Sequence, residues 1–231
     1  MDAFEAIRQN NIDRLREYIV DADLNVIDPN GDTLVHMAVA WNNVVALRLL
    51  VSAGTSEARR KARTDVLNND DELPIHIAIL HNNCDCLNEL LTDKDARNSE
   101  GMTPIHMATH RECLECLKIL IEAGADLNSV DERGYTPLHY AVSWYNLDGV
   151  KLLVEAASAS PSGLFDLPPG RGADPEIRNR WSETPYEIAT KLKDDFYVRG
   201  LNIEGELKSQ VQIIEYFKSI ELPTKPALAE N

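Results

Sequence analysis

Apolar residues recur along the chain in a fixed pattern, at positions i, i+1, i+4 and i+5 of short segments that polar stretches separate. Three central segments carry it: Ala46, Leu47, Leu50 and Val51; Cys86, Leu87, Leu90 and Leu91; and Cys116, Leu117, Leu120 and Ile121. This spacing places the four side chains of a segment on one broad stripe of an α-helix. Because the stripe returns in successive segments, we expect each helix to be covered by the next one along the chain.

A second pattern precedes each stripe and predicts where another, shorter helix begins. Its complete copies are Thr103-Pro104-Ile105-His106 and Thr136-Pro137-Leu138-His139, and its imperfect copies are Thr33-Leu34-Val35-His36, Leu73-Pro74-Ile75-His76 and Thr184-Pro185-Tyr186-Glu187. Thr can accept a hydrogen bond from the free N–H groups of a helix start, and Pro suits the first helical position, which needs no donor. Gly101 and Gly134 stand two residues earlier and permit a tight turn with positive φ. The sequence therefore predicts repeated units of turn, first helix, break and second helix.

The two terminal units differ from the others by polar residues on the stripe. The first, from Phe4 to Ile19, carries Leu15, Tyr18 and Ile19 with Arg14, and the last carries Ile213, Ile214 and Phe217 with Lys218. Capping repeats need such residues, because one face has no neighbour. We count six repeats, at about 3–30, 31–70, 71–100, 101–133, 134–180 and 181–220, in a single domain over 1–220, followed by a flexible tail over 221–231.

These features resemble those of the ankyrin-repeat family over about residues 3–220. The resemblance rests on the tetrapeptide, on Ala38, Ala78, Ala108 and Ala141 two residues after its histidine, on Asn42 and Asn82 at the break between helices, and on Glu122-Ala123-Gly124-Ala125-Asp126-Leu127-Asn128. It implies an all-α solenoid of about six helix-turn-helix repeats with projecting turn tips. The sequence departs from the family at Leu73, which replaces Thr, at Glu187, which replaces His, and where extra residues follow repeats two and five. The regularity of the stack is in doubt at those places.

Composition narrows the classes of partner. The formal net charge of −15 speaks against nucleic acid and anionic membrane surfaces and favours a protein partner with a basic surface. The sequence has no apolar run of membrane-spanning length and no apolar signal region near Met1, so we expect neither membrane nor secretory routing. We expect a monomer in the cytoplasm, with a nuclear location left open.

Catalytic motifs are missing from the sequence, and we expect a protein that is not an enzyme and uses no cofactor. One constellation offers soft metal ligands: His81, Cys84 and Cys86 with His110, Cys113 and Cys116. Zinc would need four of these converging. Cys86 and Cys116 occupy the same stripe position in successive repeats, which suits a small buried residue, so we interpret the cysteines as structural, without a metal or a disulfide. A metal- or thiol-dependent enzyme remains the alternative.

The family resemblance also assigns roles to surface positions. It implies that His36, His76, His106 and His139 are structural and hydrogen-bond between neighbouring loops. It implies that binding residues lie on the concave face, where the turn tips supply Asn30, Asp32, Asp70, Glu72, Glu100, Met102, Arg133, Tyr135, Trp181 and Glu183, and the first helices supply Trp41, His81, Arg111, Trp144 and Tyr145.

Two properties of that face point to function. Exposed aromatic residues are typical interface anchors, and Tyr135, Trp144, Tyr145 and Trp181 gather in repeats five and six. Acidic tips dominate repeats two to four and would steer a basic partner. The sequence predicts a non-catalytic protein-binding module acting as an adaptor, inhibitor or assembly factor. A short acidic solenoid is similar both to transcription-factor inhibitors that mask basic surfaces and to proteasome-assembly chaperones. An architectural scaffold without a groove ligand is the further alternative.

Two insertions interrupt the repeats. The loop at about 155–175 contains helix breakers and the apolar residues Leu164, Phe165 and Leu167, so it is either a docking element or a neutral insertion. Ser160-Pro161 within it is a candidate phosphorylation site. The segment Arg59-Arg60-Lys61-Ala62-Arg63 is interpreted as a solvated helical extension, with a nuclear-import patch as the alternative.

One modification follows from the resemblance. Leu120, Asp126, Leu127 and Asn128 match the ankyrin pattern that asparaginyl hydroxylases read, so Asn128 is a candidate for hydroxylation. The alternative, which we prefer, is that Asn128 serves the turn between repeats.

Overall fold

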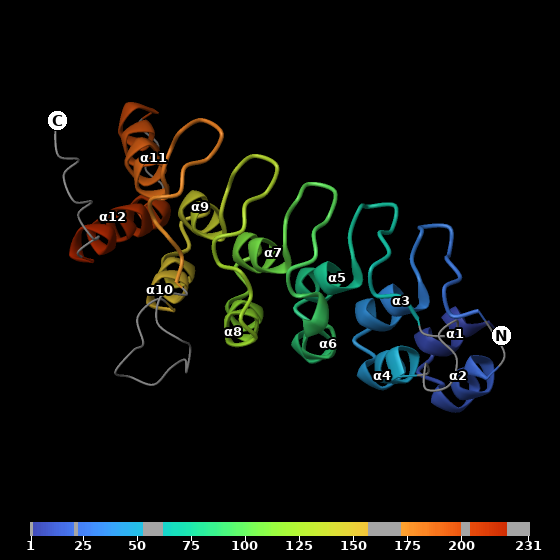
Figure 1. The fold of residues 1–231 in the computed structure, drawn as a ribbon. Helices are drawn as coiled ribbons and strands as arrows, with labels where there is room; N and C mark the ends of the chain where they lie inside the picture. Colours follow the sequence, from blue (N-terminus) through green and yellow to red (C-terminus); the bar gives the residue numbers. More distant parts are fainter. Residues whose placement is uncertain (1, 21–22, 53–61, 157–171, 200–203, 221–231) are drawn as a thin grey trace, which may run out of the picture.

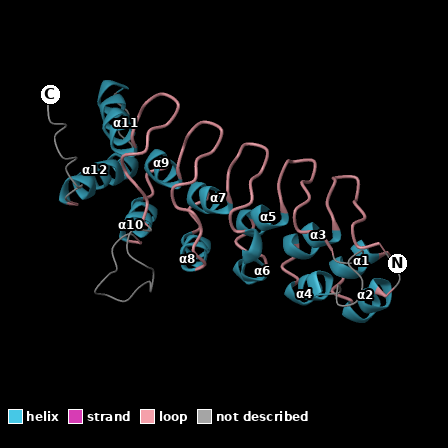
Figure 2. Ribbon diagram, viewed as in Figure 1, coloured by secondary structure: helices cyan, strands magenta, loops and turns pink. Residues whose placement is uncertain are grey.

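The computed structural model describes residues 2–20, 23–52, 62–156, 172–199 and 204–220, and these form six consecutive helix pairs. The pairs are α1 (Ala3–Arg8) with α2 (Ile12–Ile19), α3 (Leu34–Ala40) with α4 (Val44–Ser52), α5 (Pro74–Leu80) with α6 (Cys84–Glu89), α7 (Pro104–His110) with α8 (Leu114–Glu122), α9 (Pro137–Ser143) with α10 (Leu147–Glu155), and α11 (Pro185–Arg199) with α12 (Glu204–Ser219). Figure 1 shows the pairs stacked in chain order from one end of the molecule to the other. Figure 2 shows the loops between pairs projecting on one side of the stack. The predicted all-α solenoid is confirmed.

The tetrapeptide starts the first helices as the sequence predicts. In α3, α7 and α9 the hydroxyl of the N-cap Thr lies 2.8–2.9 Å from Nδ1 of the His three residues later. The Thr backbone N–H donates to the same Nδ1 at 3.1 Å. Each helix start thus has its free donors satisfied by its own sequence.

The breaks between paired helices use left-handed backbone. Asn42 and Asn82 have φ values of 50° and 55° there, as expected for Asn. Glu112 and Tyr145 occupy the same place in their repeats, with φ values of 55° and 56°. The fold therefore imposes this conformation on side chains that rarely adopt it.

The stripe residues of the second helices form the core between repeats. Ala46, Leu47 and Leu50 of α4 are fully buried, as are their counterparts Cys116, Leu117 and Leu120 of α8. Second helices pack in order, α4 on α6 and α6 on α8. Repeat three differs from the prediction, because α6 ends at Glu89 and a 3₁₀ turn, η1 (Leu91–Asp93), replaces its last turn. Leu91 is partly buried, as is its counterpart Val51 in α4.

Both described ends of the stack show the expected caps. Arg14 and Lys218 are exposed, whereas Leu15 and Phe217 are buried against the neighbouring repeat. The last repeat is larger than the sequence suggested, because α11 has 15 residues and α12 has 16.

The hairpin loops between repeats are built on a residue that the sequence reading missed. At the base of each loop one Asx side-chain oxygen accepts the backbone N–H groups two and four residues later; these Asx residues are Asp28, Asn68, Asn98, Asp131 and Asn179. Backbone bonds join successive loops: Asn69 donates to the carbonyl of Asn30 at 3.0 Å, and Arg180 to that of Arg133 at 3.1 Å. The loops therefore form a row of fixed spacing.

Gly134 shows why the turn needs glycine. It has a φ of +76°, and an added Cβ would lie 2.9 Å from the backbone nitrogen of Arg180 in the next loop. Gly101 adopts the same conformation, with a φ of +75°. The prediction of positive φ at both positions is confirmed.

The prediction that the basic segment at 59–63 is a helical extension is wrong for the two residues of it that the structure describes. Ala62 and Arg63 are not helical, and Ala62 is buried. Arg63 pairs with Asp65 at 2.9 Å instead of reaching an acidic tip. Residues 59–61 lie outside the described residues, as do Ser160, Leu164, Phe165 and Leu167 of the second insertion and the tail over 221–231. Among the described helices, none has the length and apolar character needed to cross a bilayer.

Candidate protein-binding surface

The tetrapeptide histidines hold neighbouring hairpin loops together. Nε2 of His36, His76, His106 and His139 lies 3.0–3.2 Å from the carbonyl oxygens of Glu72, Met102, Tyr135 and Glu183 respectively, in the next repeat. Burial lowers the pKa of His76 and of His106 to about 4, so both rings are neutral at neutral pH. Their predicted structural role is confirmed.

Repeat three lacks part of this arrangement. Leu73 has no hydroxyl, and Nδ1 of His76 accepts neither a hydroxyl nor a backbone N–H, unlike the histidines of α3, α7 and α9; Oε2 of Glu72 lies 3.6 Å from it. Oε1 of Glu72 accepts from Asn98 at 3.3 Å. Burial raises the pKa of the Glu72 carboxyl to about 7. When Glu72 is ionised, its Oε2 faces the lone pair on Nδ1 of His76, and this unfavourable contact destabilises repeat three.

Five rings form a continuous row across repeats four to six, which we term the aromatic ladder: Trp181, Tyr135, Tyr140, His110 and Trp144. Successive ring centroids are 5.9 Å (Trp181 to Tyr135), 5.5 Å (Tyr135 to Tyr140), 5.5 Å (Tyr140 to His110) and 5.0 Å (His110 to Trp144) apart. These separations are those of favourable tilted and edge-to-face pairs. The ladder links the tip of one hairpin to the end of a first helix.

The middle of the aromatic ladder is anchored in the fold. The Tyr140 hydroxyl donates to Oδ2 of Asp131 at 2.7 Å, and Oδ1 of the same Asp131 holds the hairpin that carries Tyr135. Tyr140 is buried, whereas Trp144 and Trp181 at the two ends are 49% and 61% exposed. A fixed centre therefore presents two large apolar side chains to solvent.

Sequence reasoning named three of the five ladder residues and missed two. Tyr140 and His110 lie at i+1 and i+4 after the tetrapeptide histidines, a spacing that places them on one side of the first helices, where Tyr140 is buried and His110 is partly buried. That signal was available in the sequence, but only the contact between neighbouring repeats shows that the rings meet.

Three of the predicted contact residues expose little or only part of their side chains. Met102 is 3% exposed, and its carbonyl oxygen accepts from His76, so it offers a partner no side chain. Tyr145 belongs to the left-handed break between α9 and α10 and is partly buried, because the chain turns there toward the second helix. Glu72 is also turned inward, with its side chain 18% exposed.

The other predicted positions lie on the expected surface. Trp41, His81, Arg111 and Trp144 follow the last residues of α3, α5, α7 and α9 and are exposed in a row. At the hairpins Asn30, Asp70, Glu100, Arg133 and Trp181 are exposed, while Asp32, Tyr135 and Glu183 are partly buried. Their role in binding stays a prediction.

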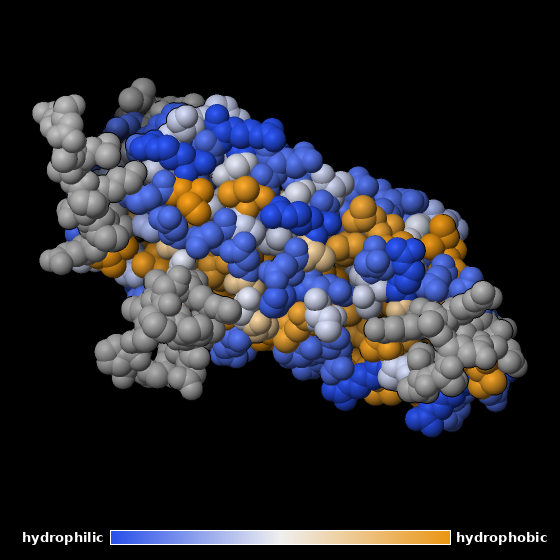
Figure 3. Space-filling model, in the orientation of Figure 1, coloured by the Kyte–Doolittle hydropathy of each residue, from blue (hydrophilic) through white to orange (hydrophobic). Residues whose placement is uncertain are grey.

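Charge is not uniform along the hairpins. The tips of repeats three and four carry Asp70 and Glu100, whereas those of repeats five and six carry both signs, Glu132 with Arg133 and Arg180 with Glu183. The acidic tips therefore lie in the N-terminal part of the row, where the sequence predicted them, and their steering role stays a prediction. Figure 3 shows a mostly hydrophilic upper rim, with hydrophobic patches lower on the same face.

The six candidate metal ligands separate in the structure. His110 belongs to the aromatic ladder, His81 is exposed, and Cys86 lies 3.4 Å from Oδ1 of Asn42. The Sγ atoms of Cys84, Cys113 and Cys116 all lie within 4.8 Å of one another. Hydrogen bonding with Cys116 lowers the pKa of the Cys113 thiol to about 7, while burial raises that of Cys86 to about 11.

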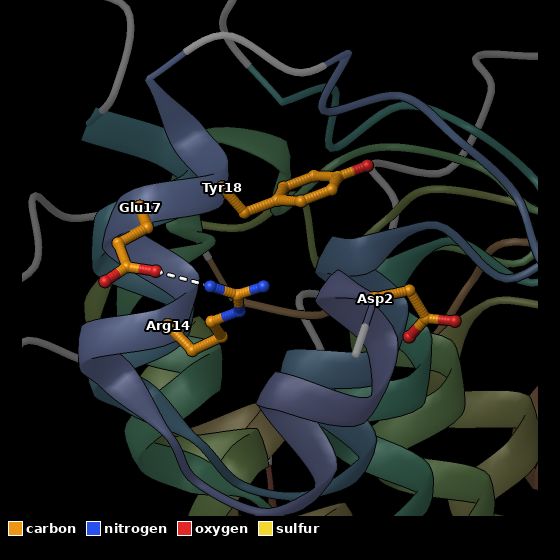
Figure 4. Close-up of a pocket in the computed structure, with 4 residues that line it drawn as sticks. All are labelled: Asp2, Arg14, Glu17 and Tyr18. Atoms are coloured by element: carbon orange, nitrogen blue, oxygen red, sulfur yellow. Dashed lines mark hydrogen bonds and ion pairs between the residues drawn. The ribbon is translucent and has the colours of Figure 1, made fainter.

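A small hollow at the N-terminal end has an ordinary structural explanation. Asp2, Arg14, Glu17 and Tyr18 line it. Figure 4 shows the Arg14 guanidinium directed between the other three side chains, paired with Glu17 at 2.6 Å. Asp2 caps α1 by accepting from the N–H of Glu5 at 2.9 Å. These contacts account for all four residues without a ligand.

Asn128, at the end of repeat four, contacts the end of the second insertion. Its Nδ2 donates to the carbonyl of Gly172 at 3.2 Å, and its Oδ1 accepts from the N–H of Asp174 at 2.7 Å. This supports a role in the turn between repeats. Hydroxylation of Asn128 stays a prediction.

Comparison with known proteins agrees with the geometry. A family model described as ankyrin repeats (3 copies) matches residues 3–99 and 75–162. Human B-cell lymphoma 3 protein is 33% identical over 116 residues, which cover 47% of this chain and 24% of that protein. Human ankyrin repeat and SOCS box protein 3 is 34% identical over 101 residues, covering 41% of this chain and 18% of that protein. The chain thus spans about a quarter or less of these relatives.

Two solved structures share the fold. The ankyrin repeat domain of Bcl-3, described as a unique member of the IkappaB protein family, has a TM-score of 0.64 and 26% identity, covering 81% of this chain and 93% of that one. A chain from the complex of the Bdellovibrio bacteriovorus endopeptidase Bd0816 with immunity protein Bd3460 has a TM-score of 0.63 and 18% identity, covering 91% and 96%, and shows the fold alone. Ankyrin repeats generally mediate binding between proteins. Because the matched segments span more than half of its residues, the chain belongs to the ankyrin-repeat family.

Proposed function

We propose that this chain is a non-catalytic module that captures a protein partner on the surface formed by its hairpin loops and first helices. The single observation that carries the proposal is the aromatic ladder, whose buried centre holds Trp144 and Trp181 exposed at its ends. Large aromatic side chains on a fixed support are the residues that most often supply binding energy in protein interfaces.

The energy available from the two tryptophans is sufficient to anchor a partner. A Trp side chain buries up to about 250 Å², so half of that area at about 25 cal/mol per Å² corresponds to roughly 3 kcal/mol for each of them before association costs. Because Tyr140 and Asp131 already fix the supporting rings, little side-chain entropy remains to be lost on binding. The ladder therefore favours a preformed interface over one that orders on contact.

Charge favours a partner with both an apolar and a basic part. The acidic tips of repeats three and four lie beyond one end of the aromatic ladder, and the chain as a whole carries a net charge of −15. An apolar contact on the ladder with basic residues toward the N-terminal hairpins would satisfy both features.

The relatives favour one of the two roles that the sequence suggested. One curated match is named B-cell lymphoma 3 protein, and another is the chicken nuclear factor NF-kappa-B p105 subunit, 29% identical over 118 residues. The solved structure of the Bcl-3 domain is described as a member of the IkappaB protein family, and this likeness is the reason to test a nuclear-factor-type partner first.

The proposal is tested by affinity capture from cell lysate with the wild-type chain, a Trp144→Ala/Trp181→Ala variant and a Val45→Ala control. Val45 is an apolar residue that is 51% exposed on the second helix α4, outside the proposed surface. We expect a partner that is retained by the control, lost by the double variant, and released as salt is raised. Circular dichroism of all three chains checks that the fold is kept. Equal capture by the control and the double variant would refute the ladder as the binding site.

A further inference from the structure

Three cysteine thiols converge at the turns between the helices of repeats three and four. Cys84 is the first residue of α6, Cys113 is the N-cap of α8, and Cys116 lies one turn into α8. Their three Sγ atoms lie within 4.8 Å of one another, and those of Cys84 and Cys116 are 3.5 Å apart. The cluster therefore spans two neighbouring repeats.

These separations fit a thiolate-bound ion. Zn–S bonds of ~2.3 Å at tetrahedral angles put neighbouring sulfurs ~3.8 Å apart, within the range that the three Sγ atoms show. The thiols also share one neighbour, because Oδ1 of Asn82 lies 2.8 Å from Sγ of Cys113, 3.6 Å from Cys84 and 3.7 Å from Cys116. One carbonyl oxygen has two lone pairs and cannot accept from three thiols, whereas a bound cation would satisfy all four groups.

Repeat two provides an internal comparison. There Asn42 occupies the position of Asn82, and a single thiol, Cys86, lies 3.4 Å from its oxygen. The contact of Asn82 with Cys116 repeats this ordinary pairing. Cys84 and Cys113 are the two additional thiols that turn this pair into a cluster. Cys113 occupies the N-cap position of α8, where other second helices have Asn.

We propose that Cys84, Cys113 and Cys116 bind one Zn²⁺ ion, with Oδ1 of Asn82 or a water molecule as the fourth ligand, and that the ion links repeats three and four. Each thiol releases its proton to solvent when the ion binds, so three thiolates and one neutral oxygen surround the metal. The negative charge of Glu115, exposed between Cys113 and Cys116 in the sequence, favours a cation at this place.

The location suits a structural clip. In repeat three α6 is shortened, and Leu73 at the N-cap of α5 has no hydroxyl. Nδ1 of His76 in the same repeat has no hydrogen-bond partner. A metal bridge from α6 to α8 would fasten this repeat to the regular repeat four beside it.

The experiment compares the reduced wild-type chain, a Cys84→Ser/Cys113→Ser variant and a Cys86→Ala control. The substituted pair is partly exposed, so its loss leaves the core intact, and Cys86→Ala recreates the Ala46 of repeat two. Each protein is titrated with Zn²⁺ against a chromophoric chelator and with Co²⁺, whose absorption reports tetrahedral thiolate ligands. Thermal unfolding is followed with and without Zn²⁺.

We expect one equivalent of Zn²⁺ per wild-type chain and per control chain, and at least a tenfold weaker affinity for the double variant. At about 100 times the Kd, Zn²⁺ should raise the Tm of the wild type and control by about 5–10 °C, and that of the double variant by little. Wild-type binding no tighter than that of the double variant, or a Co²⁺ spectrum without thiolate ligands, would overturn the proposal.

Discussion

Replacing Glu72 by Gln should stabilise this protein, and more so as the pH rises. Burial raises the pKa of the Glu72 carboxyl from 4.5 to about 7, so the folded protein holds a proton that the unfolded chain releases. Stability from this group is therefore present below pH 4.5 and is lost as the pH rises through about 7. The rise in the pKa from 4.5 to about 7, at about 1.4 kcal/mol per pH unit, sets an upper bound of about 3 kcal/mol at pH 8, and screening by solvent at this partly exposed carboxyl lowers it to about 2–3 kcal/mol.

The substitution also keeps the existing contacts. Gln at this position retains the oxygen that accepts from Asn98 and places an N–H donor where Oε2 lies 3.6 Å from Nδ1 of His76. Nε2 of His76 faces the carbonyl of Met102 and carries the ring proton, so Nδ1 is free to accept. The backbone carbonyl of residue 72, which accepts from His36, does not change.

Urea unfolding followed by circular dichroism at pH 5, 6.5 and 8 measures the effect. We expect Glu72→Gln to exceed the wild type by about 2–3 kcal/mol at pH 8 and by less than about 1 kcal/mol at pH 5. The low pKa values of His76 and His106 make the folded state lose stability as the pH falls from 6.5 toward 4, because the unfolded chain binds protons there, but both proteins share that loss. Glu122→Gln, at an exposed position, makes the same charge change. Equal pH profiles for the two variants would refute the reasoning.

Three further predictions concern the elements that hold the repeats together. Thr136→Val should cost roughly 2–3 kcal/mol in urea unfolding, because it removes the N-cap and leaves Nδ1 of His139 without its hydroxyl; a loss below about 0.5 kcal/mol would contradict the capping account. Gly134→Ala should lower stability by more than about 2 kcal/mol, since φ is +76° and the added Cβ meets the next loop, whereas Gly205→Ala, with nothing within 4 Å, should be neutral or slightly stabilising. Asn128→Ala should cost about 1–2 kcal/mol and speed exchange of the Asp174 amide, which donates to Asn128; unchanged exchange there would exclude the turn role.

The repeating parts of this fold could be predicted from the sequence because the same local sequence signals recur in each repeat. The Thr and His of the tetrapeptide, the glycine before it and the Asn at the break each act within a few residues, and the structure places them as expected. The apolar stripe works over the same short range. Elements that depend on one repeat alone, such as the shortened α6 and the long α11, departed from the prediction because no second copy indicates them.

The candidate site was harder to predict, because it depends on distances between repeats. The exposed positions of Trp144 and Trp181 follow from their register, but the rings that join them, Tyr140 and His110, come from two different first helices. The same holds for the thiols. The sequence paired Cys86 with Cys116 by register, whereas the structure pairs Cys116 with Cys84 across the interface. Register tells which face a side chain occupies and does not tell which neighbour it meets.

The unsatisfied polar groups of the stack and the proposed aromatic anchor lie in different repeats, so different variants can test them separately. The unsatisfied groups at Glu72 and His76 belong to repeat three, while the aromatic ladder belongs to repeats four to six and is held by Asp131 and Tyr140. Because every ring-to-ring contact of the ladder joins residues of repeats four to six, Glu72→Gln should change stability and leave partner capture as it is. A variant that altered both would show that the ladder depends on the packing of repeat three, and the rigid-support argument for binding would fail with it.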